Sequence, residues 1–376
     1  MSGLRVMIAG GGTGGHVMPA LAIARELRDK YGAEVQFVGT ARGLETRLVP
    51  EAGFKLELVR SGQLKNVSLA TQARTAMDVP RGVLECVRLL RAFKPQVVIG
   101  VGGYASGPGM LAAILLRVPT LAYEPNAVPG LTNRAVGQWV NAAAVNFEQT
   151  TQYFRNAEVT GVPVRPEIFA RPAKAPGANL QLLVTAGSNG AQVFNETMPK
   201  ILVGLLAEVP GLTIVHQAGP RQLEATQAAY AASGADATRW HVEAFLTDMP
   251  AQYGAADLVL ARAGSTIAEL CAAGKPSLLV PLATAADDHQ RKNAEVLVAA
   301  GAAAMLLQRD VTPASLQEAL RGLLLDPERR STMATKAKGL ARAGALERIA
   351  GMVLRLAGVE RRAQHRNRGQ EAKKQG

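Results

Sequence analysis

Residues 4–19 read LRVMIAGGGTGGHVMP, an apolar run that passes directly into a stretch of glycines. Apart from Arg5 the run is continuously apolar rather than alternating, which is typical of a strand covered by helices on both faces. The glycines permit a tight turn and a close approach of the backbone to a ligand. The apolar positions of residues 19–30 then predict a helix. A strand, a glycine loop and a helix in this order favour a parallel sheet built from βαβ units.

The same opening occurs a second time at residues 180–195, LQLLVTAGSNGAQVFN. In the first half we expect strands at residues 4–9, 34–39, 55–59, 96–101, 119–123 and 140–145. In the second half we expect them at residues 180–186, 212–217, 241–244, 257–261, 276–281 and 303–307. The duplicated opening predicts an α/β chain with two Rossmann-like domains and a ligand cleft between them. The stretch RPAKAPG at residues 171–177 is interpreted as a linker or domain edge.

Composition narrows the class of protein. The 376 residues carry a formal charge of +12, which indicates an anionic partner such as a phosphorylated substrate, a phospholipid surface or a nucleic acid. Nucleic acid is disfavoured, because aromatic residues are only 4% of the chain and no recognised binding motif is present. Two cysteines cannot build a disulfide framework, which fits a reducing cytoplasm. No apolar run reaches the roughly 18–20 residues of a membrane span.

Three glycine loops follow expected strands, at residues 10–15, 102–109 and 187–190. The carboxyl ends of parallel strands are where open α/β sheets bind ligands, so the loops predict a diphosphate or sugar-phosphate ligand. A nicotinamide or flavin site is disfavoured, because the acidic ribose partner expected about 20 residues after the first loop is missing. A second glycine-loop domain also argues against a Rossmann oxidoreductase. No P-loop signature is present.

A few polar residues beside these loops could carry chemistry. His16 ends the first loop, and a histidine there suits a general base. Glu124 follows the fifth expected strand and is interpreted as a base, a sugar-hydroxyl acceptor or a turn former. Arg165, where the two series of strands meet, could clamp a diphosphate. Glu269 could accept hydrogen bonds from two ribose hydroxyls.

The turn before Glu269 allows two interpretations. Thr266 could bind phosphate at a helix start, or Ser265 or Thr266 could form a capping box with Glu269. Further along, Asp287 and Asp288 are expected to point different ways on one helix, so we predict no metal site there.

These stretches together resemble the MurG family of N-acetylglucosaminyltransferases, and the likeness runs from about residue 5 to residue 356 with every motif in order. The motifs are GGTGGH at 11–16, GGYASGPG at 102–109, EPN at 124–126, PGLTN at 129–133, AGS at 186–188, RAGSTIAE at 262–269 and DHQ at 288–290. The resemblance implies a GT-B fold and an inverting transfer that needs no metal and no cofactor. It implies UDP-GlcNAc as donor and undecaprenyl-diphospho-MurNAc-pentapeptide as acceptor, with the sugar passing to the C4 hydroxyl of MurNAc to form lipid II.

The resemblance also implies which residues hold the donor. Phe245 would lie over the uracil, the backbone of Leu246 would bond its edge, and Glu269 would take the ribose hydroxyls. The diphosphate would be held by Arg165, Ser188 and the turn at Gly264, Ser265 and Thr266. Gln290 and Asn126 would bind the GlcNAc hydroxyls.

The acceptor would be bound in the N-terminal half by the first two loops. Their expected contacts are Thr13, Gly14, Gly15, Gly102, Gly103, Tyr104 and Ser106. Inversion needs one base on the acceptor side, for which His16 is the first choice and Glu124 the second.

The lipid acceptor further implies peripheral binding at the cytoplasmic face of the cell membrane. Residues 67–94 interleave basic with apolar residues and are a candidate for contact with an anionic leaflet; an ordinary domain helix with a charged outer face is the alternative. The apolar residues are Leu69, Val79, Val83, Val87 and Leu90, and the basic ones are Arg74, Arg81, Arg88, Arg91 and Lys94.

The expected domains are residues 1–163 for the acceptor, 164–340 for UDP-GlcNAc, 341–358 as a helix packing back on the first domain, and 359–376 as a basic tail. That tail is expected to be disordered, with adhesion to acidic headgroups as the alternative. Another GT-B enzyme, such as one that glucosylates diacylglycerol, is the nearest rival interpretation.

Overall fold

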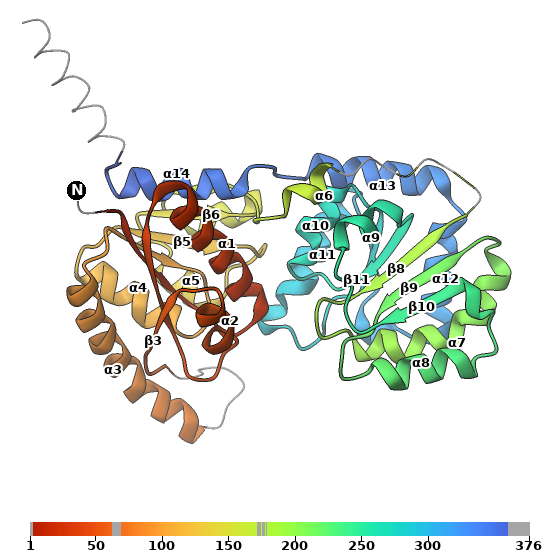
Figure 1. Ribbon diagram of the computed structural model, residues 1–376, viewed down its shortest axis with the longest axis horizontal. Helices are drawn as coiled ribbons and strands as arrows, with labels where there is room; N and C mark the ends of the chain where they lie inside the picture. The colour runs from red at the N-terminus through yellow and green to blue at the C-terminus, as the bar shows by residue number, and fades with distance from the viewer. Residues whose placement is uncertain (1–2, 62–68, 171–173, 175–176, 178, 360–376) are drawn as a thin grey trace, which may run out of the picture. The chain divides into compact units, whose positions relative to one another are not determined.

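The computed structural model describes residues 3–61, 69–170, 174, 177 and 179–359. The chain divides into two compact units, Met1–Pro163 with Gly344–Gly376 and Val164–Ala343 (Figure 1). The expected linker at 171–177 and the basic tail lie largely outside the described residues. Each unit has its own parallel sheet and its own hydrophobic core, so each is described by itself.

The first unit contains a seven-stranded parallel sheet in the order β3-β2-β1-β4-β5-β6-β7. Its strands are β1 Arg5–Ala9, β2 Glu34–Gly39, β3 Lys55–Leu58, β4 Val97–Gly100, β5 Thr120–Glu124, β6 Ala142–Val145 and β7 Ala157–Val159. β1 pairs with both β2 and β4, and its residues from Val6 to Ala9 are fully buried. Burial on both faces explains why this strand is continuously apolar in the sequence.

Helices cover both faces of this sheet. They are α1 Gly14–Tyr31, α2 Glu45–Glu51, α3 Leu69–Phe93, α4 Ser106–Leu115, α5 Leu131–Val136, the short η1 Glu148–Tyr153 and α14 Ala345–Leu356. The core on one face includes side chains of α1 and α14, and the core on the other includes side chains of α3 and α4. The C-terminal helix α14, blue in Figure 1, packs against α1 and buries Ile349, Met352 and Val353 in this core. Arg348 fixes it further by donating to the carbonyl of Thr160.

The second unit repeats the arrangement with six parallel strands in the order β10-β9-β8-β11-β12-β13. They are β8 Gln181–Thr185, β9 Thr213–Gln217, β10 Trp240–Glu243, β11 Leu258–Ala261, β12 Ser277–Leu279 and β13 Ala304–Met305. The helices are α6 Pro166–Ala170, α7 Gln192–Glu208, α8 Leu223–Ala232, α9 Met249–Ala255, α10 Thr266–Ala273, α11 His289–Ala299, α12 Pro313–Leu324 and α13 Pro327–Gly339, with η2 Ala237–Arg239, η3 Ala286–Asp288 and η4 Gln308–Asp310.

Both sheets place the strand before the glycine loop at the point where the strand order reverses, as doubly wound sheets do. The prediction of two Rossmann-like domains is therefore confirmed, and every expected strand is present. Two details differ. The helix expected from residue 19 begins at Gly14, which puts His16 in its first turn, and the short edge strand β7 was not expected.

Candidate active site

The first two glycine loops lie against each other in the first unit. The Gly11 amide donates to the carbonyl of Gly102 over 3.3 Å. A Cβ on Gly103 would fall 2.2 Å from the Gly11 carbonyl oxygen, so this approach requires glycine. Gly12, Gly102 and Gly103 all have positive φ, which side chains with a Cβ rarely adopt. The loops therefore form one rigid surface at the carboxyl ends of β1 and β4.

His16 lies on this surface in the first turn of α1, beside Thr13 as N-cap residue and the glycines at 14 and 15. Its Nδ1 is 2.8 Å from the carbonyl oxygen of Val101. A carbonyl only accepts, so the bond requires a proton on Nδ1, and the neutral ring then carries its lone pair on Nε2. A Cβ on Gly102 would come 2.7 Å from the His16 ring, so the glycine makes room for the imidazole. The side chain is half-buried.

The other residues of the second loop divide into exposed and buried. Tyr104 is exposed, and its carbonyl accepts a hydrogen bond of 2.7 Å from the Ser61 hydroxyl. Ser106 is the first residue of α4 and is fully buried. The expected acceptor contact of Ser106 stays a prediction, and it would require the acceptor to reach a residue that is buried here.

Glu124, at the end of β5, is only 2% exposed. Its Oε1 accepts from the backbone and the side-chain amide of Asn126, at 3.0 and 2.9 Å. Its Oε2 accepts from the Gly130 amide and from Asn133 Nδ2, at 3.1 and 3.0 Å. Burial raises the pKa of Glu124, and these four N–H donors oppose the rise. The carboxylate thus organises the loop from residue 124 to residue 133, Asn126 included.

In the second unit, the glycine loop after β8 is linked to the segment after β10 by a residue that sequence analysis missed. Gln217, the last residue of β9, is 3% exposed. Its Nε2 donates to the Gly187 carbonyl over 2.6 Å, and its Oε1 accepts from the Leu246 amide over 2.9 Å. Ser188 and Phe245, the neighbours of these two residues, are both exposed. One buried amide therefore connects the expected phosphate loop with the expected uracil segment.

The turn between β11 and α10 has no side-chain cap. Ser265 is the N-cap residue of α10, and its side chain makes no capping hydrogen bond. Glu269 instead accepts from the Tyr253 hydroxyl, at 2.9 Å, so the capping-box interpretation is wrong. Burial raises the pKa of Glu269, while the Tyr253 bond and the charge of Arg165 lower it. The first turn of α10 therefore offers its amides beside the half-buried carboxylate of Glu269 and near the exposed guanidinium of Arg165.

Gln290 lies beside this turn. Its Oε1 accepts from the Leu282 amide over 3.0 Å, and a Cβ on Gly264 would be 3.7 Å from its Nε2. Asp287 and Asp288 lie in the short η3 with positive φ, ahead of α11, and so are not on the regular helix expected there. Within the described residues, no three His, Cys, Asp or Glu side chains are arranged to hold a metal ion.

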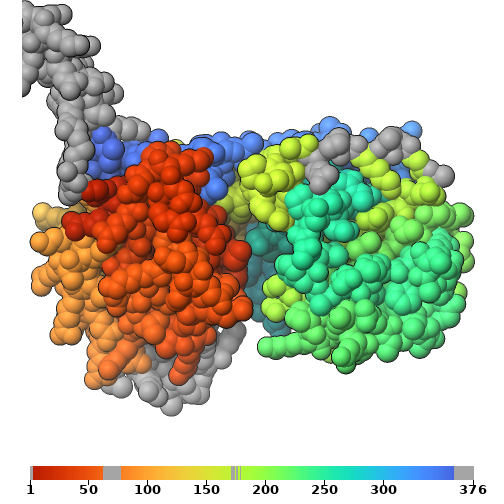
Figure 2. All heavy atoms as spheres, viewed as in Figure 1, coloured from red at the N-terminus to blue at the C-terminus, as the bar shows by residue number. Residues whose placement is uncertain are grey.

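Helix α3 contradicts one expectation about membrane contact. Leu90 is buried, and Val83 and Val87 pack against the same core, so these apolar residues face the domain interior. The outer face carries Leu84, which is 60% exposed, together with the exposed Arg81, Arg88 and Arg91. Figure 2 shows the orange atoms of α3 and α4 at the surface of this unit. Residues 67 and 68 and the side chains of Leu69 and Arg74 lie outside the described part. No described helix is both long enough and apolar enough to cross a membrane.

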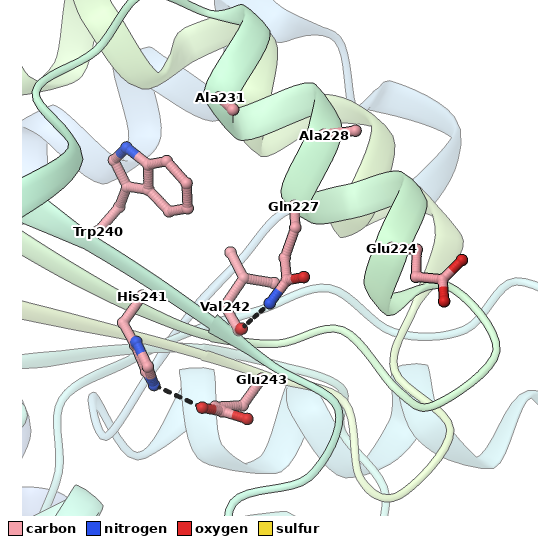
Figure 3. A pocket seen from close by; sticks show the side chains of 8 residues that line it. All are labelled: Glu224, Gln227, Ala228, Ala231, Trp240, His241, Val242 and Glu243. Carbon is pink, nitrogen blue, oxygen red and sulfur yellow. Dashed lines mark hydrogen bonds and ion pairs between the residues drawn. The ribbon is translucent and has the colours of Figure 1, made fainter.

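A separate pocket of about 520 Å³ lies between α8 and the edge strand β10 (Figure 3). His241 Nε2 lies 2.7 Å from Glu243 Oε1 on its wall, and Gln227 donates to the Val242 carbonyl. None of the expected site residues lines this pocket.

Comparison with known proteins identifies the family. Residues 6–145 match the N-terminal domain of glycosyltransferase family 28, and residues 181–349 match its C-terminal domain. The chain is 43% identical over 360 residues to the UDP-N-acetylglucosamine--N-acetylmuramyl-(pentapeptide) pyrophosphoryl-undecaprenol N-acetylglucosamine transferase of Anaeromyxobacter dehalogenans (strain 2CP-C), covering 94% of this chain and 93% of that protein. It is 42% identical over 359 residues to the protein of the same name from Xanthomonas campestris pv. campestris (strain 8004), covering 94% and 82%.

Solved structures agree with this assignment. The crystal structure of Acinetobacter baumannii MurG matches with a TM-score of 0.81 at 34% identity, covering 94% of this chain and 99% of that one. The calicheamicin glycosyltransferase CalG4 shares the fold, with a TM-score of 0.70 at 17% identity over 95% and 99% of the two chains. The chain therefore belongs to the MurG family and is a glycosyltransferase with the GT-B fold.

Proposed function

We propose that this enzyme transfers N-acetylglucosamine from UDP-GlcNAc to the C4 hydroxyl of MurNAc in undecaprenyl-diphospho-MurNAc-pentapeptide, with inversion at the anomeric carbon. The observation that carries the proposal is the 43% identity, over 94% of the chain, to relatives named for N-acetylglucosamine transfer to this lipid-linked acceptor. The two halves of the chain then have separate tasks, with the donor in the second unit and the acceptor in the first.

The donor is held by residues of three loops. Glu269 accepts from the ribose hydroxyls, because Tyr253 engages only its Oε2. Phe245 covers the uracil. The Leu246 amide already donates to Gln217, so its carbonyl is the backbone group that we assign to the base edge. Gly264 lets the backbone approach the ligand, and Gln290 bonds the GlcNAc hydroxyls with Asn126.

The leaving group is stabilised without a metal. Departure of UDP builds negative charge on the β-phosphate, and the uncapped amides of α10 at Ser265 and Thr266 are suited to receive it. Ser188 donates a hydroxyl hydrogen bond, and Arg165 supplies a positive charge. Fixed donors of this kind favour the transition state because they need no reorganisation during the reaction.

His16 is the base that we assign to the reaction, rather than Glu124. As the MurNAc C4 oxygen attacks the anomeric carbon, the bond from that carbon to the phosphate oxygen breaks and UDP departs with the electron pair. The hydroxyl proton passes to His16 Nε2, where the tautomer fixed by Val101 places the lone pair. Glu124 is less suited, since its two oxygens already accept four hydrogen bonds. We assign Thr13, Gly14, Gly15, Gly102, Gly103 and Tyr104 to the acceptor surface.

The enzyme binds peripherally to the cytoplasmic face of the membrane, where its lipid acceptor is anchored. The outer face of α3 supports this, because Arg81, Arg88 and Arg91 are exposed beside Leu84. Each basic residue near an anionic leaflet contributes about 1 kcal/mol. Replacing the three arginines by glutamine should weaken binding to phosphatidylserine-containing vesicles by roughly 100-fold. A matched variant with exposed arginines of the second unit replaced, R221Q/R309Q/R321Q, should bind as the parent does; equal binding by both variants argues against this surface.

The deciding experiment is transfer of labelled GlcNAc from UDP-GlcNAc to a lipid I analogue, with and without EDTA. Transfer that survives EDTA supports donor, acceptor class and metal independence together. Transfer to diacylglycerol but not to the lipid I analogue would favour the rival GT-B activity. Absence of both transfer and UDP-GlcNAc binding argues against the proposal as a whole.

A further inference from the structure

Three glycines near the first loop make room for a side chain of the protein itself. A Cβ on Gly11 would fall 2.2 Å from Glu45 Cδ, and one on Gly39 would fall 2.6 Å from Glu45 Cγ. A Cβ on Gly43 would lie 1.8 Å from Glu45 Oε2. Real Cβ atoms do not approach this closely, so any larger residue displaces the carboxylate. The small residues around this loop are therefore shaped to hold Glu45, which begins α2.

The carboxylate of Glu45 takes hydrogen bonds from the loop. Its Oε2 accepts from the Gly12 amide at 2.6 Å, and its Oε1 accepts from the Thr40 amide and hydroxyl at 3.0 and 3.1 Å. The side chain is 1% exposed. Amides at the start of a Rossmann helix are the groups that bind a ligand's phosphate in dinucleotide sites. Here the Gly12 amide is already bonded to an anion supplied by the chain.

The second unit treats its corresponding loop differently. There the loop is held by Gln217, a neutral side chain that contacts the carbonyl of Gly187 and not a loop amide. No carboxylate is bonded to the amides of this loop within the described residues. The two sheets share the order of their first six strands, yet they differ in charge at the equivalent place, because among the described residues only the first loop has a carboxylate on one of its amides.

We propose that Glu45 is a built-in anion that occupies the phosphate position of the first glycine loop, keeps nucleotide diphosphates out of the first unit and holds the loop for the acceptor and His16. The assignment of donor and acceptor to the two units rests on the proposed function. Glu45 acts through the loop, since its carboxylate is buried away from any substrate. It is therefore a specificity-determining and positioning residue, and the acceptor's own diphosphate must bind at groups other than the Gly12 amide.

Anion rescue tests the proposal. Glu45→Ala leaves three donors around an empty cradle of glycines, so formate or phosphate should refill it. We expect either salt to raise the melting temperature of E45A by several degrees more than equal ionic strength of chloride does. The control is Glu51→Ala, which removes an exposed glutamate from the other end of the same helix and should show no anion-specific effect. An E45A protein whose melting temperature responds equally to formate, phosphate and chloride would overturn the proposal.

Kinetics supply a second readout that a purely structural role would not produce. E45A should lose at least tenfold in transfer, with the KM for UDP-GlcNAc within twofold of the parent, and formate should restore part of the rate. If E45A does not fold, Glu45→Gln and Thr40→Val take its place. Both should lose transfer rate while the KM for UDP-GlcNAc stays within twofold of the parent, and T40V should lose less rate than E45Q. A parent-like rate, or equal damage to both substrates, contradicts the proposal. Failure of the unmodified enzyme to transfer GlcNAc would count against the proposed function instead, because the melting experiment does not depend on it.

Discussion

Two glutamates, the buried Glu124 in the first unit and the half-buried Glu269 in the second, show how differently a protein can use the same group. Burial raises the pKa of both Glu124 and Glu269. Glu124 accepts four N–H hydrogen bonds from its own loop, whereas Glu269 accepts one, from the Tyr253 hydroxyl. A carboxylate whose acceptor positions are filled by the protein is part of the framework. One with acceptor positions left over is ready for a ligand, so the number of protein donors separates the two roles.

The largest predicted effect is the loss of turnover when His16 is replaced. Glu124 cannot take its place as the base, because its two oxygens already accept four hydrogen bonds. His16→Ala should lower kcat by roughly 10²- to 10⁴-fold, the usual contribution of general base catalysis. The dissociation constant for UDP should stay within twofold, since His16 lies in the first unit, to which we assign the acceptor. Rapid-quench measurement of single turnovers, with calorimetric titration of UDP, checks both numbers. Nearly normal turnover in H16A, together with an inactive but folded E124Q enzyme, would contradict the assignment of His16 rather than Glu124 as the base.

The next largest effect is on UDP binding, through the hydrogen-bond acceptor positions of Glu269 that Tyr253 leaves unfilled. Hydrogen bonds to a charged group are worth about 1.5–3 kcal/mol each, so Glu269→Gln should weaken UDP binding by roughly 10- to 100-fold. A donor analogue tests the partner directly. The parent should discriminate against 2′-deoxy-UDP, and E269Q should discriminate much less. Equal discrimination by both proteins would mean that Glu269 does not meet the ribose.

The raised pKa of Glu269 adds a pH dependence to the same binding. A protonated carboxyl accepts more weakly, so UDP affinity should fall as the pH drops through a value above the ordinary range of glutamate. The fall should be absent in E269Q, where the side chain cannot titrate. Titration of UDP into both proteins across pH 4.5–8 provides the check.

A smaller effect is expected at Gln217, which bonds the Gly187 carbonyl and the Leu246 amide in the two segments that we assign to the nucleotide. Gln217→Glu keeps an acceptor for the Leu246 amide but replaces the donor to the Gly187 carbonyl by a negative charge. UDP affinity should fall by about tenfold, the equivalent of one hydrogen bond, while uridine affinity changes little. Gln227→Glu is the matched control, because Gln227 also donates to a backbone carbonyl but contacts neither loop. Equal losses for UDP and uridine would mean that Gln217 supports the unit only in general.

The sequence was sufficient for the fold because the signals are local. A continuously apolar strand, a glycine loop and an amphipathic helix are read within about 25 residues, and their repetition predicts the two units. The same local signals place the candidate residues His16 and Glu124 beside the loops, and the roles of these residues stay predictions. Glu45 and Gln217 were missed because each acts on a loop some 30 residues earlier in the chain, through contacts that only the folded sheet creates. For the same reason the burial of Ser106 and the inward-facing apolar residues of α3 could not be seen in the sequence.

We also expect E124Q and E269Q to differ in melting temperature. In E124Q one carboxylate oxygen becomes an NH₂ group that faces two N–H donors, so the folded state loses acceptors that it has desolvated. Each unsatisfied donor costs about 1–3 kcal/mol, and the melting temperature should fall by about 2–4 °C per kcal/mol in a domain of this size. For both glutamates the folded pKa lies above the unfolded value, so the stability that each contributes is present at low pH and is lost as the pH rises through the folded pKa. In E124Q the cost of the unsatisfied donors opposes the gain from removing the charge, whereas in E269Q the bond from Tyr253 is kept. At pH 8 the charged Glu269 is therefore a cost, and E269Q, which still accepts from Tyr253, should melt at the parent temperature or above it. A fall of equal size in both variants would show that the free positions of Glu269 are filled within the protein, and that donor counting does not distinguish framework from site.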